Sequence, residues 1–527
     1  MNNKKPIVMS SIDIGSYSLK MKIVEIDEVG NIRVLERVSK PAALGKDSFS
    51  EGKVRYETVE YICDILTGFQ ALMKEYHSKR YRAVATSAVR EAENREYLID
   101  QIRLKTGLKV EVLNNAQERY LTYKGIRENI PDHERIRNEG VLIVEVGSGS
   151  VEMTIYSEGK LRSTHNFKLG HLRLLEVLSD LKKRTLKFPE LMEEYIEGHL
   201  DILNYIEEDY SLKHFIILGS EMRGISKLLN PDQNFEKDCI VSSEAFPRLY
   251  EELLNKSIPR IVEEHQISKD LASILLPSLI LIKNFSSMTH GDNIYLPLIS
   301  LSDGIVSDFV DRRFNTQRQQ EFLEDVQQQA LGLTGKYHAD LNHARDVEEK
   351  ALLLFSALKR THGMKNREKF LLRLACKLHD IGKFVSLKKH YLHSYELIKA
   401  SPLLGLSEEE MEIVANVSKY HSSVIPHTKD ESYGRLRSKD QVITSKLTAI
   451  LRLADAMDRN HSQKISNVSI TIKDREMIIR GDAKADTLLE EWTFEIKGEF
   501  FREVFGMNPQ LKIRRKVPDG TEVAERK

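Results

Sequence analysis

Hydrophobic residues in about the first 310 positions follow two alternating patterns. They recur at every second position in three runs between residues 7 and 40, and in three more between residues 141 and 170. This alternation is typical of half-buried β-strands. Further strands are predicted at residues 81–89 and 108–113, a strand with its following turn is predicted at residues 214–224, and runs with helical spacing separate them. Strands that alternate with helices in this order predict two α/β lobes with mixed sheets.

The pattern changes near Gln317. Apolar residues at helical spacing dominate from there to about Asn460, and strand patterns return from Val468 in the runs VSITI, MIIRG, WTFEI and LKIRR. The apolar run Leu271–Ile282 is too short to cross a bilayer and is expected to be a buried helix. The predicted domains are a first lobe at residues 1–126, a second lobe at 127–312, an all-α domain at 313–462 and a small α+β domain at 463–527.

The composition of the chain indicates its cellular compartment and argues against some classes of binding partner. The chain has 79 Lys and Arg residues against 79 Asp and Glu residues, so no overall field attracts a nucleic acid. Its 3 cysteines lie in unrelated contexts, which fits a reducing cytosol rather than a disulfide framework. The N-terminal segment lacks the apolar stretch of a signal peptide, because Asp13 interrupts it. We therefore expect a cytoplasmic protein that does not associate with a membrane.

Two glycine-rich turns repeat one design. IDIGSYSLK (Ile12–Lys20) and VEVGSGSVE (Val144–Glu152) each combine a strand, an acid, glycine and serine residues, and a second strand. Glycine lets backbone N–H groups approach an anion, and serine hydroxyls add donors. The acids Asp13 and Glu145 would repel a phosphate, so they are expected to hold Mg²⁺ or a water against it. Either turn alone could be a simple hairpin, but the matched pair predicts two lobes that close on a chain of phosphates.

Five sequence motifs occur in a fixed order over about the first 300 residues. In these motifs the chain resembles the exopolyphosphatase/guanosine pentaphosphate phosphatase family. The resemblance implies two lobes with the actin-like, ribonuclease H-like fold. The motifs are IDIGSYSLKMKIVEI, ATSAVREAENREYLI, EVLNNAQERYLTYKGI, VLIVEVGSGSVEMTIY and KLGHLRL.

The resemblance implies a role for each matching residue. Glu118 would be the general base that polarises a water for attack on the terminal phosphorus, and Arg90 would be a cationic contact to phosphate. Glu145 and Glu152 would help to hold Mg²⁺. The two phosphate-binding turns would be formed by Asp13, Gly15, Ser16, Ser18, Gly147, Ser148, Gly149 and Ser150. From the residues alone, Glu118 could instead be a solvated helix residue, and Arg90 could pair with a neighbouring glutamate at the surface.

The chain departs from the usual residues of that family at four points. Tyr17 stands where the family usually has Asn, Glu145 where it has Asp, and Gln117 where it has a second Glu before the catalytic one. The third glycine turn, usually Gly-Gly-Thr, reads Gly-Ser-Glu at residues 219–221. If that loop keeps its position, Glu221 brings an extra negative charge near the anion site. These departures leave open a catalytically weakened sensor of polyphosphate or guanosine tetraphosphate.

The predicted helical domain carries an independent pattern. His343, the adjacent His379 and Asp380, and Asp455 each lie on an apolar-striped helix, and together they resemble the HD-domain metal phosphohydrolases. Imidazole and carboxylate ligands suit a divalent metal such as Mn²⁺, Fe²⁺ or Zn²⁺. In long exopolyphosphatases a similar domain often serves dimerisation, so a structural role stays open. The positions where two-metal members place the ligands of a second ion correspond to His390, His393 and His421.

The function predicted from the sequence is that of a Mg²⁺-dependent exopolyphosphatase, which removes terminal phosphates from inorganic polyphosphate. A homodimer is expected. Basic clusters at residues 359–369, 388–390 and 512–516 would lengthen the track for the polymer, although each could also be a solvated face. The alternatives are a guanosine pentaphosphate 5′-phosphatase, an HD-domain enzyme that acts on a nucleotide, and the sensor.

Overall fold

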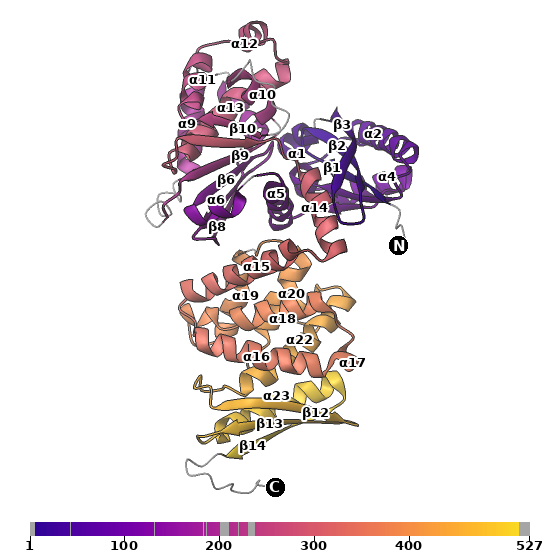
Figure 1. The fold of residues 1–527 in the computed structure, drawn as a ribbon, viewed down its shortest axis with the longest axis vertical. Coiled ribbons are helices and arrows are strands. Elements are labelled where there is room, and N and C mark those ends of the chain that lie inside the picture. Colours follow the sequence, from indigo (N-terminus) through magenta and orange to yellow (C-terminus); the bar gives the residue numbers. More distant parts are fainter. Residues whose placement is uncertain are drawn as a thin grey trace. The chain divides into compact units, whose positions relative to one another are not determined.

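The computed structural model describes residues 6–42, 44–130, 132–182, 184–185, 187–200, 210–219, 221–229, 238–401 and 403–515. The chain forms two compact units, residues 1–322 and residues 323–527. Figure 1 shows both, and each unit is described by itself.

The first lobe of the first unit is built on a five-stranded mixed sheet (Figure 1). β1 lies in the centre of the order β3-β2-β1-β4-β5, antiparallel to β2 and parallel to β4. Ile12 and Ile14 of β1 are fully buried, as expected for a central strand covered on both faces. The lobe comprises β1 (Ile7–Ile14), β2 (Ser18–Ile26), β3 (Ile32–Pro41), α1 (Leu44–Glu51), α2 (Tyr56–Glu75), β4 (Arg80–Ala85), α3 (Ser87–Glu91), α4 (Arg95–Thr106), β5 (Val110–Val112) and α5 (Asn115–Asn129).

The second lobe repeats this arrangement and adds one strand. Its sheet has the order β8-β7-β6-β9-β11-β10, in which β6 is antiparallel to β7 and parallel to β9. β6 therefore occupies the place that β1 has in the first lobe, and the predicted pair of α/β lobes with mixed sheets is confirmed. The strands are β6 (Val141–Val146), β7 (Val151–Ser157), β8 (Lys160–Phe167), β9 (His214–Leu218), β10 (Asp238–Ser242) and β11 (Asn293–Pro297). The helices are α6 (His133–Glu139), α7 (His171–Val177), α8 (Ser179–Lys182), α9 (Phe188–Leu200), α10 (Met222–Leu229), α11 (Ala245–Leu254), α12 (Ile258–His265) and α13 (Lys269–Ser286).

After the second lobe, α14 (Leu301–Phe314) returns to pack against α5, β1 and β2. Buried polar contacts fix it there. The Tyr120 hydroxyl donates to the carboxylate of Asp308 at 2.6 Å, and Lys124 pairs with Asp311 at 2.7 Å. Truncating one partner of such a buried pair typically costs about 3–5 kcal/mol of stability, so the network ties the end of the second lobe to the first.

The apolar run predicted as a buried helix, Leu271–Ile282, is confirmed as part of α13. Most of its side chains are buried, and Pro277 lies inside the helix. Among the residues described, no helix combines the length and the apolar character that crossing a bilayer requires.

The second unit is helical and ends in a small sheet, as predicted. In the order β12-β13-β14, β12 is antiparallel and β14 parallel to β13, and α23 packs against β14. The helices before the sheet are the later part of α15 (Gln317–Lys336), α16 (Leu341–Ala357), α17 (Lys359–His362), α18 (Asn366–Leu378), η3 (Ile381–Phe384), α19 (His390–Ala400), α20 (Glu408–Lys419), α21 (Glu431–Gly434) and α22 (Ser438–Ala456). The end of the chain forms β12 (Ile465–Lys473), β13 (Glu476–Ala483), α23 (Leu488–Phe505) and β14 (Asn508–Arg515).

One strand predicted near the C-terminus is wrong. The run WTFEI lies within α23 rather than in the sheet. Phe494 is buried, whereas Trp492 and Ile496, four residues apart, lie exposed on one face of the helix. Over five residues an alternation of large apolar side chains fits a strand as well as a helix face, so the short run misled the prediction.

Candidate functional site

The two glycine turns have the same local geometry. The Gly15 N–H donates to the Ser18 carbonyl at 3.2 Å, and the Gly147 N–H donates to the Ser150 carbonyl at 2.9 Å. A Cβ at either glycine would lie 3.0 Å from the accepting carbonyl, tighter than nearly all real contacts. Both turns therefore need glycine for their compactness, and the repeat recognised in the sequence is a repeat in structure.

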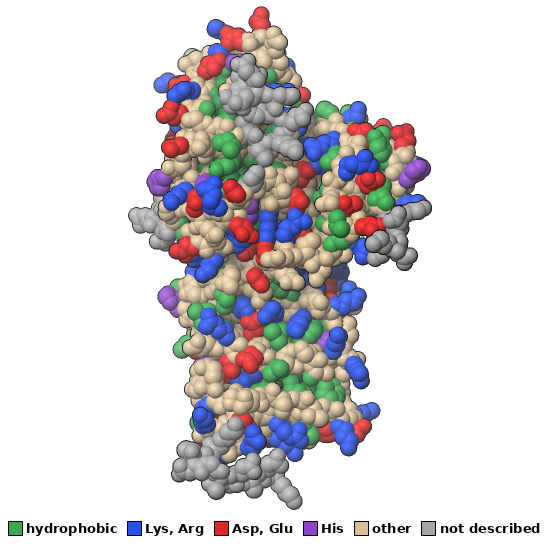
Figure 2. All heavy atoms as spheres, in the orientation of Figure 1, with side chains coloured by type: hydrophobic (Ala, Val, Ile, Leu, Met, Phe, Trp, Pro, Cys, Tyr) green, Lys and Arg blue, Asp and Glu red, His purple; other side chains and the backbone are tan. Residues whose placement is uncertain are grey.

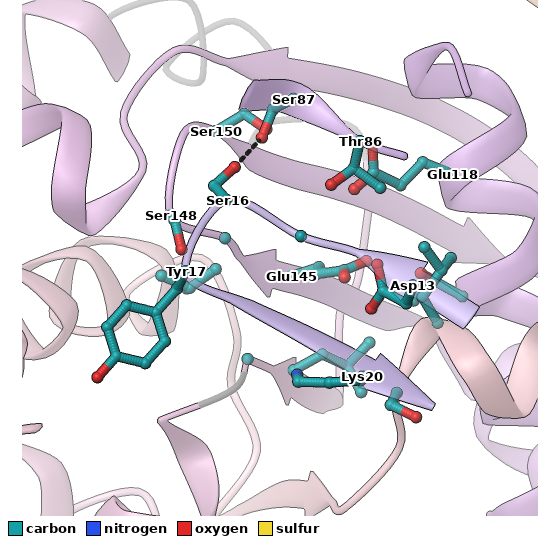
Figure 3. Close-up of a pocket in the computed structure, with 18 of the residues that line it drawn as sticks. Asp13, Ser16, Tyr17, Lys20, Thr86, Ser87, Glu118, Glu145, Ser148 and Ser150 are labelled. Carbon is teal, nitrogen blue, oxygen red and sulfur yellow. Dashed lines mark hydrogen bonds between the residues drawn. The ribbon is translucent and has the colours of Figure 1, made fainter. Parts of the chain in front are cut away.

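A single pocket brings both turns together (Figure 3). Its volume is about 120 Å³, well below the roughly 300–1,000 Å³ of sites that enclose a drug-sized ligand. It can therefore take a terminal group rather than a whole large molecule. The predicted site residues that line it are Asp13, Gly15, Ser16, Ser18, Glu118, Glu145, Gly147, Ser148 and Ser150.

Gly149 does not line the pocket but supports it. A Cβ at Gly149 would lie 2.4 Å from the ring of Phe49, a residue of α1 in the first lobe. The Arg173 Nε donates to the Gly149 carbonyl at 2.6 Å, and its guanidinium stacks on the Phe49 ring. The glycine therefore lets the second turn pack against the first lobe.

Two carboxylates at the base of the pocket have oxygens without a hydrogen-bond partner among the described residues. They are Asp13 Oδ1 and Glu145 Oε2, and both atoms are buried. Burial raises the pKa of Asp13 to about 6, with Lys20 opposing and Glu118 adding to the shift. Burial, with Glu118 nearby, raises the pKa of Glu145 to about 8. Buried carboxylate oxygens that lack a donor are the ligands that Mg²⁺ prefers, so these two residues fit the metal that the sequence implies.

Lys20 is the one Lys or Arg among the described residues that line this pocket. It comes from β2, where strand pairing sets it opposite Asp13. Three carboxylates, those of Asp13, Glu118 and Glu145, therefore face a single ammonium group. Any of these carboxyl groups that is ionised would repel a phosphate chain unless a divalent cation entered with it.

Glu118 lies in the first turn of α5 and contacts Arg90 directly. An Nη of Arg90 donates to Glu118 Oε2 at 2.9 Å and to the Leu113 carbonyl at 2.8 Å. Arg90 does not pair with either neighbouring glutamate, since Glu91 pairs with Arg173 and Glu93 with Lys53. It is absent from the pocket lining, so in this structure it holds Glu118 instead of facing the cavity.

Gln117, one of the departures from the family pattern, has a local structural role. Its side-chain oxygen accepts from the Asn114 N–H at 3.1 Å, while its own N–H donates to the Asn114 side chain at 2.8 Å. This reciprocal pair is a capping box, which fixes the start of α5 and thereby the position of Glu118.

Glu152 lies outside the pocket lining. Its Oε2 accepts from Arg119 at 2.6 Å, and its Oε1 accepts from Asn166. Burial raises its pKa to about 7, although Arg119 opposes the shift. Both oxygens are thus engaged behind the pocket, unlike those of Asp13 and Glu145, and its predicted role as a magnesium ligand stays a prediction.

Two other residues that differ from the family pattern, Tyr17 and Glu221, differ in their position relative to the pocket. Tyr17 lines the pocket, and Figure 3 shows its ring directed away from Asp13 and Glu145. Glu221 is absent from the lining and fully buried. The carboxyl group expected near the anion site therefore lies behind the lining, next to Gly219, rather than in the pocket. Ser220, between Gly219 and Glu221, lies outside the described residues.

In the second unit, the four predicted HD-type residues converge. His343 Nε2 lies 3.2 Å from His379 Nε2, and Asp455 Oδ1 lies 3.3 Å from the first and 3.7 Å from the second. Asp380 Oδ2 lies 3.8 Å from His343 Nε2. All four residues are buried. Three of them, His343, His379 and Asp380, offer ligand atoms close enough together to hold one divalent ion.

Asp380 also belongs to a second group. Its other oxygen, Oδ1, lies 3.4 Å from His390 Nε2 and 3.5 Å from His421 Nε2. These two imidazole nitrogens are 3.2 Å apart. His393 belongs to neither group. Asp380 therefore stands between two sets of imidazoles, with one oxygen toward each.

The imidazoles are held in one orientation by the contacts of their other nitrogen. Nδ1 of His343 contacts Asp458 at 2.8 Å, while Nδ1 of His379 and of His421 contact the carbonyls of Cys376 at 2.8 Å and Ser418 at 2.6 Å. Second contacts of this kind fix the ring so that Nε2 points at a metal. This arrangement is typical of a metal centre.

Sequence reasoning missed several residues that these sites use. Thr86 and Ser87 line the phosphate pocket, and the Ser16 and Ser87 hydroxyls lie 2.9 Å apart. Thr86 and Ser87 belong to the motif TSAVREAEN, which is the sequence signal that could have found them. In the second unit, Asp458 and Lys497 contact the metal-site residues. Lys497 lies on the C-terminal helix, and no sequence spacing links it to the histidines.

The pocket offers carboxylates for a divalent cation, hydroxyls and glycine turns for phosphate oxygens, and Glu118, which Arg90 keeps in place. This combination is typical of a metal-assisted phosphatase. Comparison with known proteins agrees. Residues 22–313 match the Ppx/GppA phosphatase family, and residues 327–496 match domain III of the Ppx/GppA phosphatases. The chain belongs to the Ppx/GppA phosphatase family and is a phosphoanhydride hydrolase by that membership.

Individual relatives are distant. A guanosine-5′-triphosphate,3′-diphosphate pyrophosphatase of Photobacterium profundum is 22% identical over 414 residues, which covers 77% of this chain and 79% of that protein. A protein of the same name from Pseudoalteromonas translucida is 21% identical and covers 89% of this chain and 90% of its own. The crystal structure of an exopolyphosphatase from Cytophaga hutchinsonii has a TM-score of 0.51 and 21% identity, covering 58% of this chain and 98% of its own. This last likeness supports the fold of the two lobes.

Proposed function

We propose that this chain removes the terminal phosphate from inorganic polyphosphate by attack of a water that Glu118 activates. One observation carries the proposal. Glu118, both glycine turns and two buried carboxylates with unpartnered oxygens line the same small pocket. A pocket of that size favours the end of a phosphate chain over its middle.

In the proposed mechanism, Glu118 takes a proton from the attacking water, which is general-base catalysis. The water oxygen bonds to the terminal phosphorus as its P–O bond to the rest of the chain breaks, so that orthophosphate and the shortened chain are the products. Arg90 holds the carboxylate in place through its 2.9 Å contact. N–H groups and hydroxyls of the two turns orient the phosphate oxygens. Mg²⁺ bound by Asp13 and Glu145 would neutralise charge on those oxygens. The lysine ammonium of Lys20 would add one further positive charge to the site.

The second candidate substrate is guanosine pentaphosphate. The names of the curated relatives favour it. So does the pocket, which offers one lysine rather than a long basic track. Three members of the basic clusters predicted for the polymer are already paired, Arg367 with Glu410, Arg514 with Asp482 and Arg515 with Asp486. Lys516 of the last cluster lies outside the described residues. On the face drawn in Figure 2, positive and negative side chains are interspersed.

Salt dependence should separate the two substrates. A polymer contacts several cations at once, so we expect its KM to rise at least about tenfold between 50 and 200 mM salt, and that of guanosine pentaphosphate to rise less. Free phosphate release from both substrates, with Mg²⁺ and at matched ionic strength, measures this. Equal salt dependence would indicate that the protein holds only the end of either chain. The nucleotide would then become the better candidate.

A second activity is proposed for the second unit on the strength of its two groups of ligands around Asp380. We propose that His343, His379, Asp380 and Asp455 bind Mn²⁺, Fe²⁺ or Zn²⁺, and that this centre hydrolyses a phosphate ester of a nucleotide. Lys383, whose ammonium lies 2.5 Å from Asp380 Oδ2, would be a cationic contact for the substrate. Metal analysis of the purified protein by mass spectrometry tests the first step.

Lys497 offers a sharper test of this centre. Its ammonium contacts Asp455 Oδ2, while Asp455 Oδ1 faces the histidines. It therefore orients a ligand, and Lys497→Met is expected to lower the affinity for metal by about 10–100-fold. The matched control is Lys464→Met, since Lys464 pairs with Glu490 of the same helix but not with a ligand. Equal affinities in the parent and the Lys497 variant, measured by competition with a chelator, would remove this role.

The predicted domain boundaries, the homodimer and the cytoplasmic location stay predictions. α14 lies mainly within the predicted second lobe, but it packs with α5 and β1 of the first. Gel filtration with light scattering would test the homodimer.

A further inference from the structure

Two ionisable side chains are buried together behind the second glycine turn. His171 begins α7, and Glu221 lies just before α10. Neither side chain has exposed surface, and His171 Nε2 lies 3.6 Å from Glu221 Oε2. The Ser278 hydroxyl of α13 donates to Glu221 Oε1 at 3.3 Å. Three helices of the second lobe thus meet at this pair.

The histidine side of the pair is joined to the second turn. The His171 N–H donates to the Gly147 carbonyl at 3.2 Å, and the next two N–H groups of α7 both donate to the Ser148 carbonyl at 3.1 Å. A Cβ at Gly170 would lie 2.4 Å from that same carbonyl oxygen. The start of α7 therefore lies directly against the turn that lines the pocket.

The glutamate side is joined to the third turn. Gly219 lines the pocket after β9. A Cβ at Gly219 would lie 2.9 Å from Glu221 Oε1 and 2.9 Å from the Val146 carbonyl, which immediately precedes the second turn. The Glu221 carboxylate therefore lies directly behind Gly219, and both turns rest on one buried pair.

We infer that His171 and Glu221 are positioning residues that hold the second and third turns in register around the phosphate pocket. A buried carboxylate is costly without polar groups around it, and the imidazole of His171 and the hydroxyl of Ser278 both lie against that of Glu221. The pair deepens the proposed function, on which it rests, because it assigns the geometry of the phosphate-binding turn to residues that do not touch the phosphate.

The test combines hydrogen exchange of the turn with kinetics on the full chain. His171→Leu removes the imidazole that lies against the Glu221 carboxylate, so amides of residues 147–150 and 219 should exchange faster than in the parent. With the turn displaced, kcat/KM for polyphosphate with Mg²⁺ should fall by about a hundredfold. The double variant His171→Leu/Glu221→Leu removes both ionisable groups and should recover most of the protection and the turnover. Glu221→Gln, which keeps shape and a polar partner, should change both only slightly.

The matched control is His133→Leu, which removes another buried histidine of the same unit, one that packs on Tyr123. It should leave exchange of the turns unchanged. Parental exchange in His171→Leu would overturn the inference, whatever the turnover. A double variant as impaired as the single one would also overturn it, because the loss would then come from the histidine itself. A third outcome separates the two proposals. If the turn amides exchange slowly in the parent and fast in His171→Leu, but neither protein hydrolyses polyphosphate or guanosine pentaphosphate, the inference is supported and only the proposed function is contradicted.

Discussion

Glu118→Gln is expected to lower phosphate release at saturating substrate by about 10²–10⁴-fold, the usual cost of losing a general base. The amide keeps the size of the side chain and can still accept from Arg90, so the local contacts should persist. It cannot take a proton from water. Binding of a phosphate analogue such as Mg²⁺·imidodiphosphate should therefore remain close to parental, while turnover falls.

The control for this variant is Glu128→Gln. Glu128 lies on the same helix, α5, but pairs with Arg318 away from the pocket. Its turnover should stay within about twofold of the parent, because a surface substitution of this kind is nearly neutral. Near-parental turnover in Glu118→Gln would deprive Glu118 of its assigned role and move the search to Asp13 or Glu145.

The second large effect is expected in the second unit. His379→Ala combined with Asp380→Ala should reduce bound transition metal to below about a tenth of the parental content, since water cannot replace two protein ligands at equal affinity. Asp380 contributes to both groups of ligands, so its loss affects both. Hydrolysis of polyphosphate by the first unit should persist, because Glu118 and the glycine turns lie in that unit.

Elemental analysis measures the bound metal, and circular dichroism shows whether the variant is folded. His427→Ala is the control, since His427 is exposed and belongs to neither group. A parent without transition metal would contradict the proposed centre. A folded variant that had lost polyphosphate hydrolysis would contradict the independence of the two sites.

The fold was largely predictable because its signals are local. Alternating apolar residues marked β1, β2, β6 and β7, and helical spacing marked the second unit. WTFEI failed because five residues carry too little periodicity, and the packing of α23 decided its conformation. The sequence could not have indicated that α14 packs back on the first lobe, because that depends on contacts of Asp308 and Asp311 with α5.

The candidate site was predictable as far as its motifs extend. The turns, Glu118 and the HD-type residues lie in recognisable patterns, and the structure brings each set together. Pairings between distant segments were not predictable. Arg90 contacts Glu118 instead of lining the pocket, and Glu221 turns inward to His171 instead of facing the anion. Side-chain direction depends on tertiary packing, which spacing along the chain does not encode.

The central claim is that the pocket of the first unit removes terminal phosphates with a water activated by Glu118. The most direct measurement is polyphosphate hydrolysis with Mg²⁺ in ¹⁸O-labelled water, with products followed by ³¹P NMR and mass spectrometry. The proposal predicts orthophosphate that carries ¹⁸O, chains shortened from their ends, and almost no product from Glu118→Gln. No orthophosphate from the parent, or equal release from parent and variant, would contradict it.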